Sequence, residues 1–279
     1  MIQILSILHT HDINIICTQE DILLGSYPNI RPEYESIYTS YGYTAITHDI
    51  LDYSKSKTLV SKYPAKQVYL GNVIYVRSTL EHKVNTLIAK PNPCPACIAQ
   101  IQFDHILIAN VHLCGGRYDD TLVFREPNFF RSKLESVRAI DHDIVCGDFN
   151  ATRCLGEPGG LKNYTYPIEL YKQYSKSKPT IDMISTWNTW QCSPIEFFFD
   201  QLYRSCFSDE QLDIIGETTN RGHNVVDWVF YDPRQIKRFD SHCEPMYDDS
   251  SHILSDHHMV MFKFSTNIKT EANGKSYYV

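Results

Sequence analysis

Five short apolar runs, each joined to an acid, a histidine or an amide, constrain this chain more than any other feature of its sequence. In chain order they are INIICTQE (13–20), HILIANVHL (105–113), DIVCGDFN (143–150), NVVDWVFY (224–231) and LSDHHMVMF (254–262). Runs of this length and composition are typical of strands covered on both faces. Loops at strand ends are where proteins usually carry chemistry. The polar residues of these runs are therefore candidates for one functional site.

Other segments predict the elements between these runs. Apolar spacing predicts helices over 2–12, 31–42, 124–141, 182–190 and 208–215. Further strands are expected at 43–48, 71–78, 96–103 and 235–246. Strands in groups of two or three with helices between them favour a layered α/β domain. We expect one domain over residues 1–266 and a polar C-terminal tail, 267–279, that frays.

Composition excludes some classes of function. The formal net charge is -7 and the pI is near 5.9, which argues against a broad nucleic-acid-coating surface but allows a small metal-bearing site. Nine cysteines, an odd number, predict reduced thiols and an intracellular protein. No apolar run is long enough to span a membrane, and no secretory signal is evident. The CxxC of Cys94 and Cys97 lacks a second pair, so a Pro-rich turn is favoured over a zinc site.

Taken singly, each polar residue of the five runs has an ordinary explanation. Glu20 at a strand end can simply be solvated, and His112 can be a hydrogen-bonded edge residue. Asp227, inside an apolar strand, is harder to dismiss because a buried carboxylate needs a partner. The ordered set carries the signal.

That ordered set resembles the endonuclease/exonuclease/phosphatase superfamily, which has the DNase I-like fold. The resemblance spans roughly residues 12 to 265. It implies a four-layer α/β/β/α sandwich, with two mixed β-sheets face to face and helices outside. It also implies a divalent metal, Mg²⁺ or Mn²⁺, and hydrolysis of phosphoester bonds in nucleic acid or another phosphoester substrate. Neither a membrane nor an obligate protein partner is implied.

The same resemblance assigns expected roles. Catalytic positions are His112, Asp148, Asn150, Asp227 and His257; metal-binding positions are Glu20 and Asp256. Phosphate esters repel an incoming hydroxide, so such a site must neutralise charge and position water. Mg²⁺ prefers oxygen ligands and retains waters, so two carboxylates suffice. Asp148 is expected to accept a proton from the attacking water, and Asn150 to donate to a phosphate oxygen. Asp227 is expected to favour the protonated imidazole of His257.

The chain departs from the family pattern at its start. The family normally begins with a further strand that ends in an asparagine near the metal. No residue before Glu20 matches that position, since Asn14 lies inside an expected strand. A sheet without that strand is expected to leave its neighbour exposed. A weakened or inactive binding module of the same fold is therefore an alternative to an active enzyme.

The substrate is less constrained. Arg117 in a Gly-Gly-Arg loop and Arg221 before Asp227 are weaker candidates for substrate binding. Trp187 and Trp190 could stack on bases, but their helical spacing is more typical of a core. The residues around GDFN do not fit the inositol-polyphosphate phosphatase branch, and the acidic chain disfavours an abasic-site endonuclease. A nuclease or tyrosyl-DNA-phosphodiesterase-like enzyme, or a phosphatase of a small phosphoester, remains.

Overall fold

A computed structural model describes the elements that carry these motifs. The described residues are 8, 10–26, 29–51, 67–87, 97–113, 127–153, 192–215, 218, 225–244, 257–266 and 276–278. Within them lie most of the expected strands and three of the expected helices.

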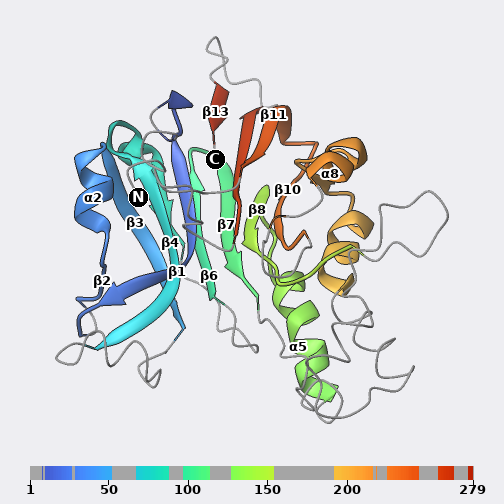
Figure 1. Cartoon of the computed structure of the whole chain (residues 1–279), viewed down its shortest axis with the longest axis horizontal. Coiled ribbons are helices and arrows are strands. Elements are labelled where there is room, and N and C mark those ends of the chain that lie inside the picture. Colours follow the sequence, from blue (N-terminus) through green and yellow to red (C-terminus); the bar gives the residue numbers. More distant parts are fainter. Residues whose placement is uncertain are drawn as a thin grey trace.

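Two sheets form the centre of the molecule (Figure 1). The first has the order β2-β1-β4-β3, built from β1 (Ile15–Leu24), β2 (Arg31–Pro32), β3 (Tyr43–Leu51) and β4 (Val68–Arg77). The second has the order β5-β6-β7-β8-β10-β9, built from β5 (Val84–Thr86), β6 (Cys97–Phe103), β7 (Ile106–His112), β8 (Ile144–Asp148), β9 (Arg204–Ser205) and β10 (Asp227–Tyr231). β3 and β4 contact β6, and β1 contacts β7 and β8, so the two sheets pack against each other.

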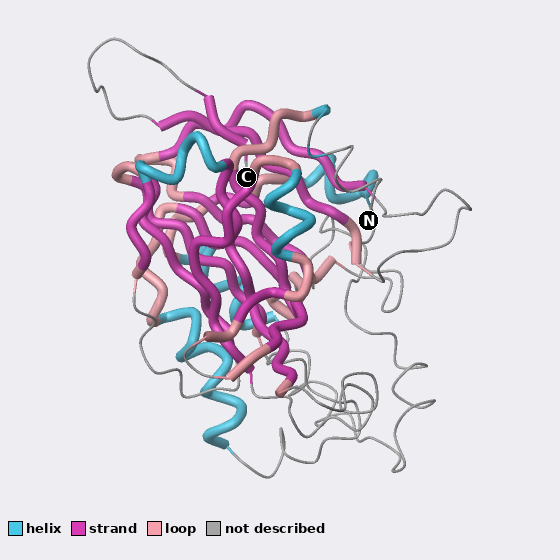
Figure 2. Tube along the Cα trace, turned by 90° about the vertical axis from the view of Figure 1, so that its left-hand side faces the viewer, coloured by secondary structure: helices cyan, strands magenta, loops and turns pink. Residues whose placement is uncertain are grey.

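A third, antiparallel sheet and several helices complete the described structure. The sheet has the order β11-β12-β13, from β11 (Ile236–Glu244), β12 (Met259–Thr266) and β13 (Ser276–Tyr278). The helices are α2 (Glu35–Ser40), the 3-10 helix η1 (Ser78–Lys83), α5 (Pro127–Arg138), a helix over 192–200 and α8 (Asp209–Ile215). In Figure 1, α2 lies outside the first sheet, and α5 and α8 lie outside the second. Figure 2, turned by 90°, shows the strands gathered at the centre. The predicted α/β class with packed sheets is confirmed.

The core lies between these sheets and beneath α5 and α8. Ile101, Ile108, Val111, Ile144 and Phe230 are fully buried. These residues come from the apolar runs that predicted doubly covered strands, and β7 and β8 are parallel, the arrangement in which both faces are covered.

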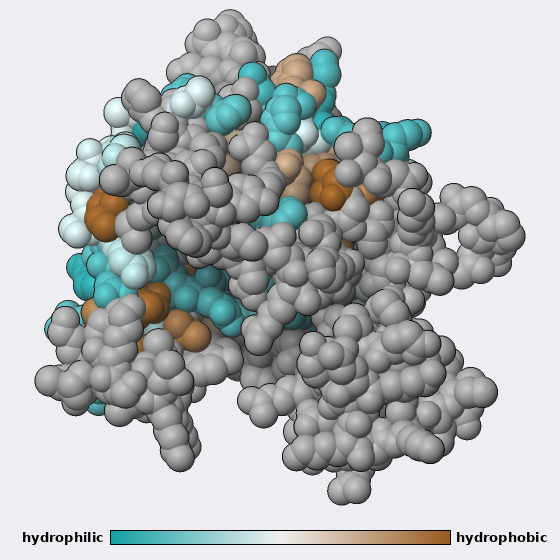
Figure 3. Space-filling model, viewed as in Figure 1, coloured by the Kyte–Doolittle hydropathy of each residue, from teal (hydrophilic) through white to brown (hydrophobic). Residues whose placement is uncertain are grey.

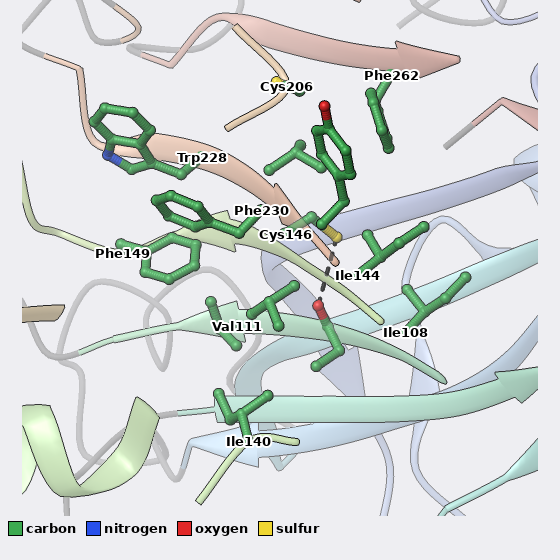
Figure 4. Packing of buried hydrophobic residues seen from close by; sticks show 14 of the residues in the cluster. Ile108, Val111, Ile140, Ile144, Cys146, Phe149, Cys206, Trp228, Phe230 and Phe262 are labelled. Atoms are coloured by element: carbon green, nitrogen blue, oxygen red, sulfur yellow. Dashed lines mark hydrogen bonds between the residues drawn. The ribbon is translucent and has the colours of Figure 1, made fainter. Parts of the chain in front are cut away.

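Aromatic rings fill the part of the core nearest the GDFN segment (Figure 4). Phe230 stacks on Trp228 at 5.5 Å between ring centroids and meets Phe149 edge-on, also at 5.5 Å. Edge-to-face and offset stacked pairs of this kind add to the free energy of burial. The polar loop at the end of β8 therefore rests on a rigid apolar base.

Some elements differ from the expected ones. β1 does not end at Glu20 but continues to Leu24 through a register shift between Thr18 and Asp21. The helix over 192–200 was not anticipated, and residues 276–278 of the polar tail form β13 beside β12. Of the helix expected over 2–12, Leu8 and Thr10 are described and are helical, while the one expected over 182–190 lies outside the described residues.

One edge of β1 is open in the part of the chain that the structure describes. β4 pairs with β1 from Ile15 to Leu24, but β2 pairs only with Leu23 and Leu24. In the third sheet, β13 pairs with Lys263, Phe264 and Ser265 of β12.

The remaining expectations concern surface and thiols. The coloured part of the face in Figure 3 is mostly hydrophilic, with hydrophobic residues scattered across it. No described helix combines the length and apolarity that a membrane crossing needs. Cys17, Cys97, Cys146, Cys206 and Cys243 are free thiols, as expected. Cys192 is disulfide-bonded, which corrects the expectation that every cysteine is reduced; bonding depends on which thiols the fold brings together, and sequence spacing does not show this.

Candidate active site

Three predicted site residues form one row across neighbouring strands. β8 lies between β7 and β10, parallel to the first and antiparallel to the second. The register pairs His112 with Asp148, and Asp148 with Asp227. Directly opposed residues on adjacent strands are close enough for their side chains to interact. The sheet therefore places an imidazole and two carboxylates side by side.

His257 joins this row from the segment that leads into β12. Its Nδ1 atom lies 2.9 Å from Oδ2 and 3.1 Å from Oδ1 of Asp227. Asp227 is buried, and burial raises the pKa of its carboxyl group to about 6; the Asp148 charge acts in the same direction and the His257 hydrogen bond opposes it. The predicted Asp227–His257 pair is therefore present, and it provides the partner that a buried carboxylate requires.

Thr218 supports this pair from outside the strands. Its hydroxyl oxygen accepts hydrogen bonds from the backbone N–H groups of Val226 and Asp227, both at 3.0 Å. Its carbonyl oxygen accepts from the backbone N–H of His258 at 2.8 Å. Thr218 is fully buried and so links the start of β10 to the segment carrying His257.

Two imidazoles converge on one oxygen of Asp148. Nε2 of His112 lies 3.7 Å from Asp148 Oδ2, and Nε2 of His257 lies 3.8 Å from the same atom. These separations exceed a direct hydrogen bond. A water molecule between these groups would donate a hydrogen bond to the carboxylate and accept from the imidazoles.

The GDFN loop fixes the orientation of Asp148. The backbone N–H of Asn150 donates to Asp148 Oδ1 at 2.7 Å, and Asn150 Nδ2 donates to Asp148 Oδ2 at 3.1 Å and to the Leu113 carbonyl at 2.9 Å. Asn150 has a φ of 45°, a left-handed conformation that asparagine tolerates better than most residues. Both amide hydrogens have acceptors within the protein, so Asn150 orients Asp148; donation by Asn150 to a phosphate oxygen stays a prediction.

A buried lysine holds the same loop from behind. Nζ of Lys133, in α5, donates to the Asn150 carbonyl at 2.5 Å, and the residue is fully buried. Sequence reasoning missed this contact. The signal was a lysine on the apolar face of the helix, four residues before Val137 and seven before Ile140, both buried.

Glu20 approaches the row from the opposite sheet. It lies at the register shift in β1, with a φ of 53°. Its Oε1 atom is 3.9 Å from His112 Nε2, and its side chain is 62% exposed. Glu20 therefore brings an accessible carboxylate to the edge of the cluster.

A cavity of about 420 Å³ opens beside this cluster. Glu20, Asp148, Asp227 and His257 line it together with the apolar residues of β1 and β12. The polar cluster is thus reachable from a space between the sheets and is not sealed in the core.

The arrangement offers two ways to hold a cation. Asp148, Asp227 and His257 have ligand atoms within 4.8 Å of one another. However, both oxygens of Asp227 already face His257 Nδ1, and both oxygens of Asp148 already accept from Asn150. Glu20 has the more accessible carboxylate, and hard divalent cations prefer such oxygens. The accessible carboxylate of Glu20 therefore suits a hard divalent cation.

The chain matches the model of the Endonuclease/Exonuclease/phosphatase family over residues 1–257. It belongs to this family. Family members are phosphoesterases, so the match supports a hydrolase. No curated protein matches the chain significantly.

One solved structure supports the fold, and two others are similar to a lesser degree. The human Nocturnin catalytic domain with bound sulfate is similar with a TM-score of 0.53 at 16% identity, over 95% of this chain and 84% of that one. A D. rerio TDP2 structure with single-stranded DNA product is similar with a TM-score of 0.44 at 13% identity, over 94% of this chain and 90% of that one. An Archaeoglobus fulgidus AP endonuclease is similar with a TM-score of 0.47 at 12% identity, over 92% of this chain and 91% of that one.

The structure thus brings together most of the predicted site residues. Glu20, His112, Asp148, Asp227 and His257 form one continuous cluster, and Asn150 contacts Asp148. The predicted metal ligand Asp256 and the candidate substrate-binding residues Arg117 and Arg221 lie outside the described residues, as do Trp187, Trp190 and Cys94.

Proposed function

We propose that this family member is a divalent-metal-dependent phosphodiesterase that cleaves phosphodiester bonds in nucleic acid. The convergence of His112 and His257 on one oxygen of Asp148 carries the proposal. It combines a carboxylate that can take a proton with two imidazoles that can face a phosphate, at an accessible cavity.

Asp148 acts as the proton acceptor for the attacking water. Its Oδ2 atom faces the gap between the imidazoles, while Asn150 and the GDFN backbone hold the carboxylate in place. A positioned general base of this kind contributes about 10² to 10⁴ in rate. Because Asn150 restrains both oxygens, little reorientation is needed when water arrives.

His257 and His112 bind the phosphoryl group. The Asp227 carboxylate at Nδ1 stabilises the protonated form of His257, whose Nε2–H then donates to a phosphoryl oxygen. His112, from β7, donates from the other side of Asp148. Together they place positive charge where the phosphate carries negative charge.

Glu20 and Asp256 are the residues proposed to hold Mg²⁺ or Mn²⁺. When bound, such a cation stabilises charge on the phosphoryl and leaving oxygens. Glu20 contributes an exposed carboxylate on the side of the cluster next to His112.

The test is hydrolysis by the purified chain of bis(p-nitrophenyl) phosphate, p-nitrophenyl phosphate, and single- and double-stranded DNA and RNA. Each reaction contains Mg²⁺, Mn²⁺ or EDTA, and Asp148→Ala is the blank. We expect metal-dependent cleavage of a diester that the variant lacks. Cleavage of the monoester alone would indicate a small-phosphoester phosphatase. Nucleic-acid binding without cleavage in any metal would indicate a binding module and contradict the proposal.

A further inference from the structure

The β1 bulge, residues 18–21, gives Glu20 a backbone conformation that needs support. The β1–β4 register shifts between Thr18 and Asp21, and Glu20 has a φ of 53°. This left-handed conformation is unfavourable for a residue that has a Cβ atom, because Cβ comes too close to the following carbonyl oxygen, so it persists only where neighbouring contacts hold it. What holds the bulge therefore also determines where the Glu20 carboxylate lies.

Asn110 of β7 supports the bulge from the inner side. This residue is fully buried. Its Oδ1 accepts from Gln19 Nε2 at 2.6 Å, and its Nδ2 donates to the carbonyls of Thr18 at 2.9 Å and Val73 at 3.1 Å. Thr18 and Val73 are the last cross-strand pair before the register shift. The side-chain amide of Asn110, from the second sheet, thus hydrogen-bonds to both β1 and β4 of the first sheet where their register shifts.

A second network supports the bulge from its other side. Asp21 Oδ2 accepts from the Thr18 hydroxyl and from the Tyr75 hydroxyl, both at 2.9 Å. Thr18 and Asp21 flank Gln19 and Glu20, so this carboxylate ties the two ends of the bulge together. With Asn110 inside and Asp21 bridging the ends, the backbone of Glu20 is constrained on both sides.

Asn110 also shares a strand with a site residue. Side chains alternate along a strand, so Asn110 and His112 project to the same face of β7. Asn110 contacts the bulge, and His112 Nε2 lies 3.9 Å from Glu20 Oε1. The same short stretch of β7 therefore fixes the bulge and supplies the imidazole that faces it.

We propose that Asn110 is a positioning residue that holds the Glu20 carboxylate for cation binding. This inference rests on the proposed function, because it takes Glu20 as a ligand. Asn110 does not itself touch substrate or cation. It acts through Gln19 and Thr18, and its loss would let the bulge relax and move the carboxylate.

Asn72 of β4 offers a matched control. It is also fully buried, and its Nδ2 donates to two backbone carbonyls, of Cys97 at 3.1 Å and Asn110 at 3.0 Å. Its side chain makes no hydrogen bond to residues 18–21 among those that the structure describes, although Asn72 lies opposite the bulge in β4, between Val73 and Gly71. Replacing either asparagine with leucine removes a buried amide of similar size and leaves two carbonyls without that donor. Only the Asn110 change removes side-chain hydrogen bonds to residues of the bulge.

The experiment measures Mn²⁺ affinity from the free-ion electron paramagnetic resonance signal, without substrate. It compares the unmodified chain with Asn110→Leu, Asn72→Leu and Glu20→Gln, each also unfolded in urea to record stability. We expect Asn110→Leu to weaken Mn²⁺ binding about tenfold or more, as loss of outer-shell support does at metal sites. Asn72→Leu should lose comparable stability and keep its affinity within about twofold. Gln19→Met, a milder break of the same contact, replaces Asn110→Leu if that chain does not fold.

The outcomes separate this inference from the proposed function. If Glu20→Gln loses Mn²⁺ affinity while Asn110→Leu and Gln19→Met keep it, the positioning role is wrong and the metal site stands. Equal weakening in the Asn110 and Asn72 variants would show that both act only on stability, which also overturns the inference. If Glu20→Gln binds Mn²⁺ as the unmodified chain does, the assignment of Glu20 fails and the positioning role fails with it.

Discussion

The Nδ1 atom of His257 lies within 3.1 Å of both carboxylate oxygens of Asp227, across 30 positions of sequence. The contact joins β10 of the second sheet to the segment that enters β12 of the third. It pairs a buried carboxylate with an imidazole whose other nitrogen faces Asp148. This relationship is the basis of the first prediction.

Asp227→Asn removes the negative charge at Nδ1 of His257 while preserving shape. We expect phosphodiester hydrolysis to fall by about 10²-fold or more, because the imidazole loses the charge that stabilises its protonated form. The control is Asp240→Asn, which alters an exposed pair in which His242 Nε2 lies 2.8 Å from Asp240 Oδ2. Steady-state kinetics should show the same rate of hydrolysis for Asp240→Asn as for the unmodified chain. A fully active Asp227→Asn chain would contradict the role assigned to the pair.

Asn150 combines a left-handed backbone with a side chain that orients Asp148, and two substitutions separate these contributions. Both Asn150→Gly and Asn150→Ala should lose most activity, because each lacks the amide that donates to Asp148 and Leu113. Alanine at a φ of 45° is strained, so the free energy of unfolding in urea should be about 1 kcal/mol lower for Asn150→Ala than for Asn150→Gly. Equal stability of the two variants would indicate that the loop relaxes its backbone.

Mn²⁺ should raise the melting temperature of the unmodified chain, because a ligand that binds the folded state stabilises it by an amount that grows with the logarithm of its concentration over its Kd. Glu20→Gln should lose most of this rise while melting at the same temperature in EDTA, since the Glu20 side chain is 62% exposed. The matched substitution Glu81→Gln, at an exposed position of η1, should keep the full rise. Differential scanning fluorimetry over a series of Mn²⁺ concentrations measures both.

His142 predicts acid sensitivity unrelated to the active site. Its ring is buried, neither ring nitrogen has a hydrogen-bond partner among the described residues, and burial lowers its pKa from 6.5 to about 4, against an opposing effect of Asp141. Between these pH values the unfolded chain binds a proton that the folded chain does not. The free energy of unfolding therefore falls as pH drops from about 6.5 to about 4, by on the order of 3 kcal/mol.

His142→Leu should flatten that slope, since leucine does not titrate. The hydrogen bond from the Tyr203 hydroxyl to the residue 142 carbonyl involves only backbone and should persist. His82→Asn, at an exposed position of η1, serves as the control and should leave the slope intact. Urea unfolding at pH 4, 5, 6 and 7 provides the comparison. Parallel curves for the His142 variant and the unmodified chain would disprove the assignment.

Local pattern was enough to locate the strands and their polar ends. The runs around Cys146, Val111 and Trp228 are continuous and apolar because both faces of those strands are covered, so their assignment needed no tertiary information. Gly42 likewise marked the end of α2, with a φ of 84° that favours glycine. The candidate residues followed from the order of these segments and the family that they resemble.

The β1 bulge could not be predicted in this way. The run INIICTQE shows an apolar strand, but the register slip at Glu20 depends on Asn110 and Tyr75, which are distant in sequence. The hydrogen bond from the Asn150 amide to the Leu113 carbonyl was likewise not predictable, because it depends on how Leu113 docks beside the loop. Strand order, with β8 between β7 and β10, is a tertiary property that aligns His112, Asp148 and Asp227.

Because Glu20, Asp148 and His257 come from, or directly border, three different sheets, catalysis requires the sheets to dock in their final arrangement. Pairings this distant in sequence form slowly during refolding. After dilution from urea, the far-ultraviolet circular dichroism of the sheets should therefore recover before phosphodiester cleavage does. The recovery of phosphodiester cleavage would then report when the sheets dock. Simultaneous recovery of the two signals would show that the sheets form and dock in one step.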